Sequence, residues 1–122
     1  MLAVCGIVRQ KGRILMCKRP ACGMLPGFWE LPTECLEENE TLEDALERVF
    51  FERLTVNPKQ MRAVGAVSVK DIRLLAYEVE LRKNFFHIYG YEDFRWVKPR
   101  RLSKMRIFEP HVTILTETCM LV

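Results

Sequence analysis

Runs of apolar residues with strand-like composition alternate with polar turns along most of this chain. The runs that predict strands are residues 3–8, 14–18, 61–69, 72–81 and 94–97. The polar segment Gln10-Lys11-Gly12-Arg13 separates the first two runs, so we expect these two to form a β-hairpin. Residues 20–27 hold two prolines and two glycines and are expected to form a loop. Residues 28–31 form a short apolar piece that Pro32 closes, and residues 33–39 are expected to be a polar loop.

One segment follows the helical period instead. An apolar stripe recurs every three or four residues from Leu42 to Leu54, which predicts a helix with one buried face. Thr41 is the expected N-cap, with Asp44 three residues later to complete a capping box. A second helix is expected from Pro110 to about Cys119. Mixed strands with two helices predict an α/β or α+β fold, in which a β-sheet is sandwiched between helices.

Length and composition limit the class of protein. The chain has 122 residues, enough for one domain with its own core, and we expect residues 1–122 to form a single domain. Hydrophobic residues make up 49% and charged residues 29%, which argues against a disordered or fibrous protein. No apolar run approaches the roughly 20 residues that span a bilayer. The first apolar run also lacks the features of a signal peptide, and five cysteines without CxxC pairing suggest reduced thiols, so we expect a cytoplasmic protein.

Charge is distributed unevenly along the chain, although the net charge is only +3. Residues 1–29 carry +5, residues 30–54 carry −7 and residues 55–122 carry +5. A compact acidic block between two basic ones fits a site where carboxylates hold a divalent cation and nearby cations hold an anionic substrate. A solvated acidic loop and helix face explains the same pattern.

Several motifs together resemble the Nudix superfamily across essentially the whole chain. In order, they are Lys18-Arg19-Pro20, the run from Gly23 to Pro32 that contains Gly27-Phe28-Trp29-Glu30-Leu31-Pro32, the acidic loop with its capped helix, and Phe94-Arg95-Trp96-Val97. Within the superfamily, the chain is most similar to MutT-like nucleotide pyrophosphatases and to the C-terminal domain of MutY-type adenine glycosylases. The resemblance implies the Nudix fold.

The Nudix box, GX5EX7REUXEEXGU with U a bulky aliphatic residue, aligns without a gap from position 34 to position 56. The matching residues are Glu40, Arg48, Glu52 and Val56, with an aromatic, Phe50, in the first aliphatic position. The residues that differ are Glu34 and Thr55 for the two glycines, and Val49 and Arg53 for two of the glutamates. In the family, the glutamate and arginine that correspond to Glu40 and Arg48 are often structural partners.

The missing glutamates bear directly on chemistry. Hydrolysis of a phosphoanhydride uses divalent ions held by clustered carboxylates, and helix positions 49, 52 and 53 lie on adjoining turns. Val49 cannot bind a metal, and Arg53 repels one. The resemblance therefore implies Mg²⁺ or Mn²⁺ chemistry in which Glu52 is the remaining catalytic carboxylate, with Glu34 as a second metal ligand. Activity is expected to be weak or lost.

The resemblance also assigns substrate-binding residues. Arg19 falls where relatives place a basic residue over the substrate phosphates, and Lys18 lies beside it. Trp29 is either a stacking surface for a base or a core residue. Phe108 occupies the position at which MutT-like relatives use an asparagine to read oxidised guanine.

Two functions follow as hypotheses. The first is hydrolysis of nucleoside triphosphates or other nucleoside diphosphate derivatives, including oxidised guanine nucleotides. The second is a non-catalytic module that recognises a nucleotide or an oxidised base, as the similar glycosylase domain does. A basic stretch, comprising Arg95, Lys98, Arg100, Arg101, Lys104 and Arg106, either contacts nucleic acid, which is not favoured, or is solvated. No membrane partner is expected, and the sequence leaves the oligomeric state open.

Overall fold

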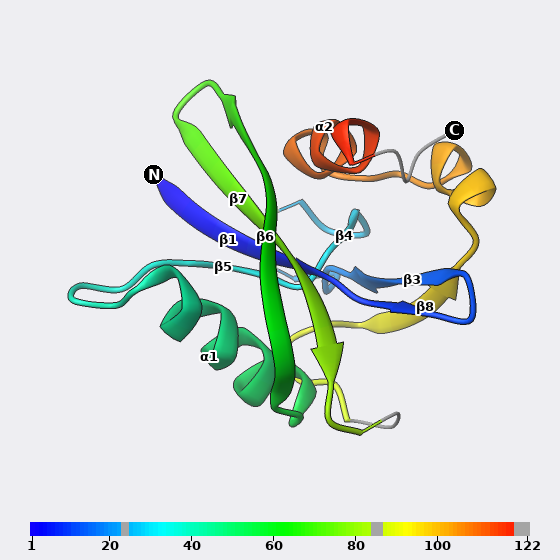
Figure 1. Ribbon diagram of the computed structural model, residues 1–122. Coiled ribbons are helices and arrows are strands. Elements are labelled where there is room, and N and C mark those ends of the chain that lie inside the picture. Colours follow the sequence, from blue (N-terminus) through cyan, green and yellow to red (C-terminus); the bar gives the residue numbers. More distant parts are fainter. Residues whose placement is uncertain (23–24, 84–86, 119–122) are drawn as a thin grey trace.

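Two β-sheets and two α-helices make up the fold, and the computed structural model describes residues 1–22, 25–83 and 87–118 (Figure 1). The elements in chain order are β1 (Leu2–Ile7), β2 (Arg9–Gln10), β3 (Arg13–Lys18), β4 (Trp29–Glu30), β5 (Thr33–Cys35), α1 (Leu42–Leu54), β6 (Pro58–Val69), β7 (Ile72–Leu81), β8 (Asp93–Val97), the 3-10 helix η1 (Pro99–Lys104) and α2 (Glu109–Glu117). Part of the expected loop, Gly23-Met24, and the expected helix end near Cys119 lie outside the described residues.

The larger sheet has the strand order β5-β1-β7-β6, and its strands are mixed in direction. Strand β1 runs parallel to β7 and antiparallel to β5, and β6 and β7 form an antiparallel pair. In the smaller sheet, β3 pairs with β2, β4 and β8, all antiparallel. The expected mixed sheet is confirmed.

The predicted hairpin between residues 3–8 and 14–18 was wrong in its first strand. β1 lies in the larger sheet, and the hairpin is formed by the short β2 with β3. Its two-residue turn consists of Lys11 and Gly12, both with positive φ, as type I′ turns require. Alternation of apolar residues predicts a strand but not its partner, which explains the error.

Three other segments differ from the prediction. The expected polar loop 33–39 begins with a strand, because Thr33–Cys35 pairs antiparallel with β1 as β5. This strand is polar because it lies at the edge of its sheet. Strand β6 begins at Pro58, earlier than expected, where proline costs no interior ladder bond because it is the first residue of the strand. The 3-10 helix η1 was not predicted.

Helix α1 has the predicted bounds, and its start is fixed locally. The Thr41 side chain accepts a hydrogen bond from the Asp44 backbone N–H, and the Asp44 side chain accepts one from Thr41 N–H. The helix ends at Leu54, and the C-cap residue Thr55 has left-handed backbone angles (φ 54°, ψ 34°). Helix α2 begins one residue before the predicted Pro110. Among the described residues, no helix is long and apolar enough to cross a membrane.

The two α-helices cover opposite faces of the larger sheet (Figure 1), as expected. Alternate residues of β1 divide between the two cores: Cys5 and Ile7 pack with α2, whereas Val4 packs with α1. Gly6 allows the close approach of α1, because a Cβ atom there would lie 2.6 Å from the Phe50 ring. The box helix is thus held firmly against the sheet.

Candidate functional site

The segment from β5 to α1 brings the predicted box residues to one region of the molecule. Helix α1 turns its apolar stripe to the core, and Val49 on that stripe is fully buried. Glu52 is exposed and makes no hydrogen bond or ion pair with any residue that the structure describes. Arg53 is partly buried and reaches β5. Positions 49, 52 and 53 therefore do not present a row of carboxylates.

Arg48 and Glu40 form a two-pronged ion pair. Arg48 Nε donates to Glu40 Oε2 at 2.8 Å and Arg48 Nη2 donates to Oε1 at 3.1 Å. The same Nη2 donates to the Cys35 carbonyl at 2.8 Å, so Arg48 connects the helix, the turn before it and β5. Hydrogen bonding by Arg48 lowers the pKa of Glu40. These bonds join the end of β5, the turn and α1.

Glu34 lies between two guanidinium groups. Arg53 Nη2 donates to Glu34 Oε2 at 3.2 Å, and Arg48 Nη1 lies 3.6 Å from the same oxygen. The contact joins β5 to α1 across 19 positions of sequence. The carboxylate proposed from sequence as a metal ligand is therefore neutralised by two arginines.

Arg19 binds a buried carboxylate that the sequence analysis did not include in the site. Its Nη1 donates to Glu30 Oε1 at 2.6 Å, and the Glu30 side chain is only 2% exposed. Tyr91, also buried, donates from its hydroxyl to Glu30 Oε2 at 3.3 Å. Burial raises the pKa of Glu30 despite these contacts. An acid between apolar neighbours, in Trp29-Glu30-Leu31, was the sequence signal for this buried group.

Lys18 and Trp29 are placed differently from what a substrate-binding role suggests. Lys18 Nζ lies 3.3 Å from Glu92 Oε2, so the lysine is paired. Trp29 is 8% exposed and belongs to the core beside α2, with the Arg95 guanidinium 5.1 Å from its ring centroid. Of the two interpretations of Trp29 from sequence, the core position describes its environment.

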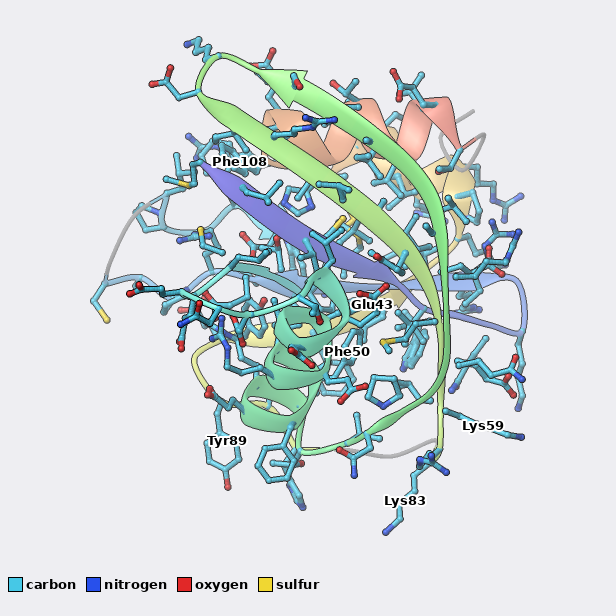
Figure 2. The ribbon with its side chains drawn as sticks, turned by 60° about the vertical axis from the view of Figure 1, so that its left-hand side comes forward. Glu43, Phe50, Lys59, Lys83, Tyr89 and Phe108 are labelled. Atoms are coloured by element: carbon cyan, nitrogen blue, oxygen red, sulfur yellow. The ribbon has the colours of Figure 1, made fainter. Side chains whose placement is uncertain are left out.

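Phe108 lines a small apolar cavity of about 120 Å³ that also borders Glu34. Figure 2 shows Phe108 near the start of β1, whose residue Ala3 is part of the same lining. His111 lines the cavity too; its buried Nδ1 has no hydrogen-bond partner among the described residues. The cavity is smaller than the roughly 300 Å³ or more of a typical ligand pocket, so it has room for only part of a ligand.

The site is a poor ligand set for a divalent ion. Within residues 1–22, 25–83 and 87–118, no three His, Cys, Asp or Glu side chains are grouped so that they could hold a metal. Each carboxylate facing this region from the sheets, Glu30 and Glu34, is already paired with an arginine. A divalent cation needs several available oxygen ligands, and the carboxylates of Glu30 and Glu34 are occupied by arginine side chains instead.

The basic stretch lies elsewhere, around the end of β8 and η1. A cavity of about 490 Å³ is lined there by five cationic residues, namely Arg13, Arg95, Lys98, Arg101 and Lys104. None of its lining residues is acidic. Contact with nucleic acid at this surface stays a prediction.

Comparisons with known proteins agree with this fold. The family model described as "NUDIX domain" matches residues 3–117. Nucleoside triphosphatase NudI of Escherichia fergusonii is 27% identical, over 83% of this chain and 84% of the relative. The solution structure of the E. coli ORF135 protein has a TM-score of 0.83 at 22% identity and covers 97% of this chain and 87% of that one. The NUDIX domain of Shewanella oneidensis NrtR, complexed with ADP ribose, has a TM-score of 0.79 at 18% identity, over 98% of this chain and 86% of that chain.

Proposed function

This chain belongs to the NUDIX domain family, and we propose that it is a nucleotide pyrophosphatase of that family whose metal-dependent turnover is strongly reduced. The proposed substrates are nucleoside triphosphates or other nucleoside diphosphate derivatives, including oxidised guanine nucleotides. The relative from E. fergusonii, named a nucleoside triphosphatase, supports this substrate class. We further propose that residues 1–122 act as one domain in the cytoplasm.

The contact between Arg53 and Glu34 carries the proposal. A guanidinium group stands in the box where a glutamate is expected, and it neutralises a nearby carboxylate at 3.2 Å. Nudix hydrolases use divalent metals, which neutralise phosphate oxygens and activate water when bound. For this chain the metal is proposed to be Mg²⁺ or Mn²⁺. Glu52 is the box carboxylate left to assist it, and a single exposed carboxylate is a poor ligand set.

The chain's own residues have two further proposed roles. Arg48 and Glu40 hold the box segment against β5 through bonds of 2.8 to 3.1 Å. The apolar cavity beside Phe108 receives the base. The alternative of a base-recognition module like the MutY C-terminal domain is less favoured, because the relative from E. fergusonii is named for hydrolysis.

A hydrolysis assay tests the proposal. Purified protein is incubated with Mg²⁺ or Mn²⁺ and each common nucleoside triphosphate, as well as 8-oxo-dGTP, and release of monophosphate and pyrophosphate is measured. Slow release that Glu52→Gln abolishes is the expected result. Glu80→Gln is the matched control, because Glu80 is an exposed glutamate of β7 whose ion pair, among the described residues, is with Lys59. Turnover of the Glu52→Gln variant equal to that of the unmodified protein would contradict the role of Glu52.

Arg53→Glu supplies a second readout in the same assay. It removes the positive charge from the box and leaves Glu34 without one of its two arginines. At saturating nucleotide, kcat with Mg²⁺ is expected to rise, because both changes favour cation binding. A fall in kcat would show that Arg53 assists hydrolysis and would overturn the explanation of reduced activity.

A further inference from the structure

The Arg53 side chain is held by contacts with three residues. Its Nη2 donates to Glu34, its guanidinium carbon lies 5.3 Å from the centroid of the Tyr91 ring, and its Nη1 packs over Gly90. A Cβ atom at Gly90 would lie 3.0 Å from that Nη1, and Gly90 has a φ of +76°. The backbone of Arg53 is also held, since its carbonyl accepts a hydrogen bond from Tyr89 N–H at 2.7 Å. The side chain is 34% exposed, so it is fixed and still reachable by a ligand.

The fixed guanidinium is a permanent cation at a box position where the family places a metal-binding carboxylate. A guanidinium carries five donors in a planar fork that matches the oxygens of phosphate groups, and it stays charged at every physiological pH. Only Nη2 of Arg53 donates to Glu34. Glu34 has a second contact, with Arg48 Nη1 at 3.6 Å, and the remaining donors of Arg53 are available to an incoming anion.

The apolar cavity and Arg53 are neighbours through Glu34. Glu34 is one of the residues that line the cavity, and its carboxylate also pairs with Arg53. A nucleotide whose base enters the cavity beside Phe108 therefore extends its phosphates past Glu34 toward Arg53 and Arg48. The Arg53 donors that do not bind Glu34 are available to the phosphates there, and no group of metal-binding side chains is present among the described residues.

We propose that Arg53 replaces the metal ion as the cation that binds the diphosphate group, so that this domain binds nucleoside diphosphates without a divalent metal. The proposal rests on the proposed function only for the class of ligand. It adds that binding and metal dependence are separated in this chain: metal affects the slow hydrolysis, whereas binding needs Arg53.

Isothermal titration calorimetry tests this directly. ADP, GDP, CDP and UDP are titrated in turn into the full chain, once with EDTA and once with Mg²⁺. At least one is expected to bind in EDTA, with a Kd that Arg53→Gln weakens by about tenfold, equivalent to about 1.4 kcal/mol. Arg62→Gln is the matched control, because Arg62 donates to Glu78 at the same 3.2 Å on the distant strand pair β6 and β7. This control is expected to bind as the unmodified chain does.

The outcomes separate the two proposals. Binding that requires Mg²⁺ overturns the inference and leaves the proposed function standing. Binding in EDTA that Arg53→Gln does not weaken also overturns the inference, since another group then holds the phosphates. No binding in either condition removes the proposed function as well. Where Arg53→Gln does not fold, Arg53→Lys replaces it. This variant keeps the charge but lacks the planar fork, and it is expected to bind the nucleoside diphosphate more weakly than the unmodified chain does. A further test uses the unmodified chain in EDTA, where equal affinity for a nucleoside diphosphate and its monophosphate overturns the inference.

Discussion

Arg19, just after β3, and Glu30 of β4 form an ion pair of 2.6 Å in which the acid is almost completely buried and the base is 29% exposed. The carboxylate has lost its water and relies on Arg19 and on the Tyr91 hydroxyl. Burial raises the pKa of Glu30, so the buried charge is costly even with its partners in place. The pair joins two strands of the smaller sheet and is sensitive to loss of either member.

Replacement of Arg19 by methionine is expected to destabilise the fold by about 2 kcal/mol. The value is below the roughly 3–5 kcal/mol for breaking a fully buried pair, because Arg19 is partly solvated. The double variant Arg19→Met/Glu30→Gln should recover most of the loss, since no buried charge remains. Urea denaturation of both variants and of Glu30→Gln alone completes the cycle. An equal loss in the single and the double variant would show that the packing of Arg19 is what matters.

The raised pKa of Glu30 predicts the direction in which the effect of Arg19→Met changes with pH. The pKa of Glu30 is raised in the folded state, so the folded protein takes up this proton more readily than the unfolded chain does. The cost of burying the group is absent below the unfolded pKa of about 4.3 and grows as pH rises toward the folded pKa. The loss caused by Arg19→Met should therefore be smaller at about pH 4 than at pH 7. Denaturation curves at the two pH values measure it.

Arg48→Met is expected to lower the Tm by several degrees at neutral pH. Arg48 supplies the donors for Glu40 and for the Cys35 carbonyl, which lose their partner. The pKa of Glu40 is lowered in the folded state, so the stability from this pair is present above about pH 4.3 and is lost as pH falls through the folded pKa. The melting temperatures of the two proteins should converge in acid. Arg62→Met, which removes a mostly exposed pair, should change Tm little.

Local features of the sequence predicted parts of this molecule well, and long-range features did not. The bounds of α1 follow from a stripe and a capping box within 14 residues, Thr41 to Leu54, so the prediction needed no tertiary information. The partner of β1 was missed because β7 lies some 70 positions later in the chain. The Arg53–Glu34 pair was missed for a similar reason: sequence spacing showed an arginine in the box, but only the packing of α1 beside β5 decides that its charge is neutralised.

His111→Gln tests a second titrating group. Burial, with Arg19 nearby, lowers the pKa of His111 to about 3, far below the 6.5 of an exposed histidine. The unfolded chain therefore binds a proton between about pH 6.5 and pH 3 that the folded protein does not, and the unmodified protein loses stability as pH falls through that range. In His111→Gln the slope of unfolding free energy against pH should be smaller over that range. Only the slope is compared, because the substitution also changes packing beside Phe108. An unchanged slope would contradict a neutral buried imidazole.

Val49→Glu examines whether the box helix can return to the family pattern. The substitution places a carboxylate where the side chain is fully buried against the core that contains Phe50, and it is expected to cost about 3 kcal/mol or more. Phe51→Glu, two positions further along α1 at a residue that is 63% exposed, is the matched control and should change stability by less than about 0.5 kcal/mol. Chemical denaturation of both variants gives the comparison. A stable Val49→Glu protein with increased Mg²⁺-dependent turnover would mean that α1 rotates to present position 49 to solvent, and that packing does not block recovery of the metal site.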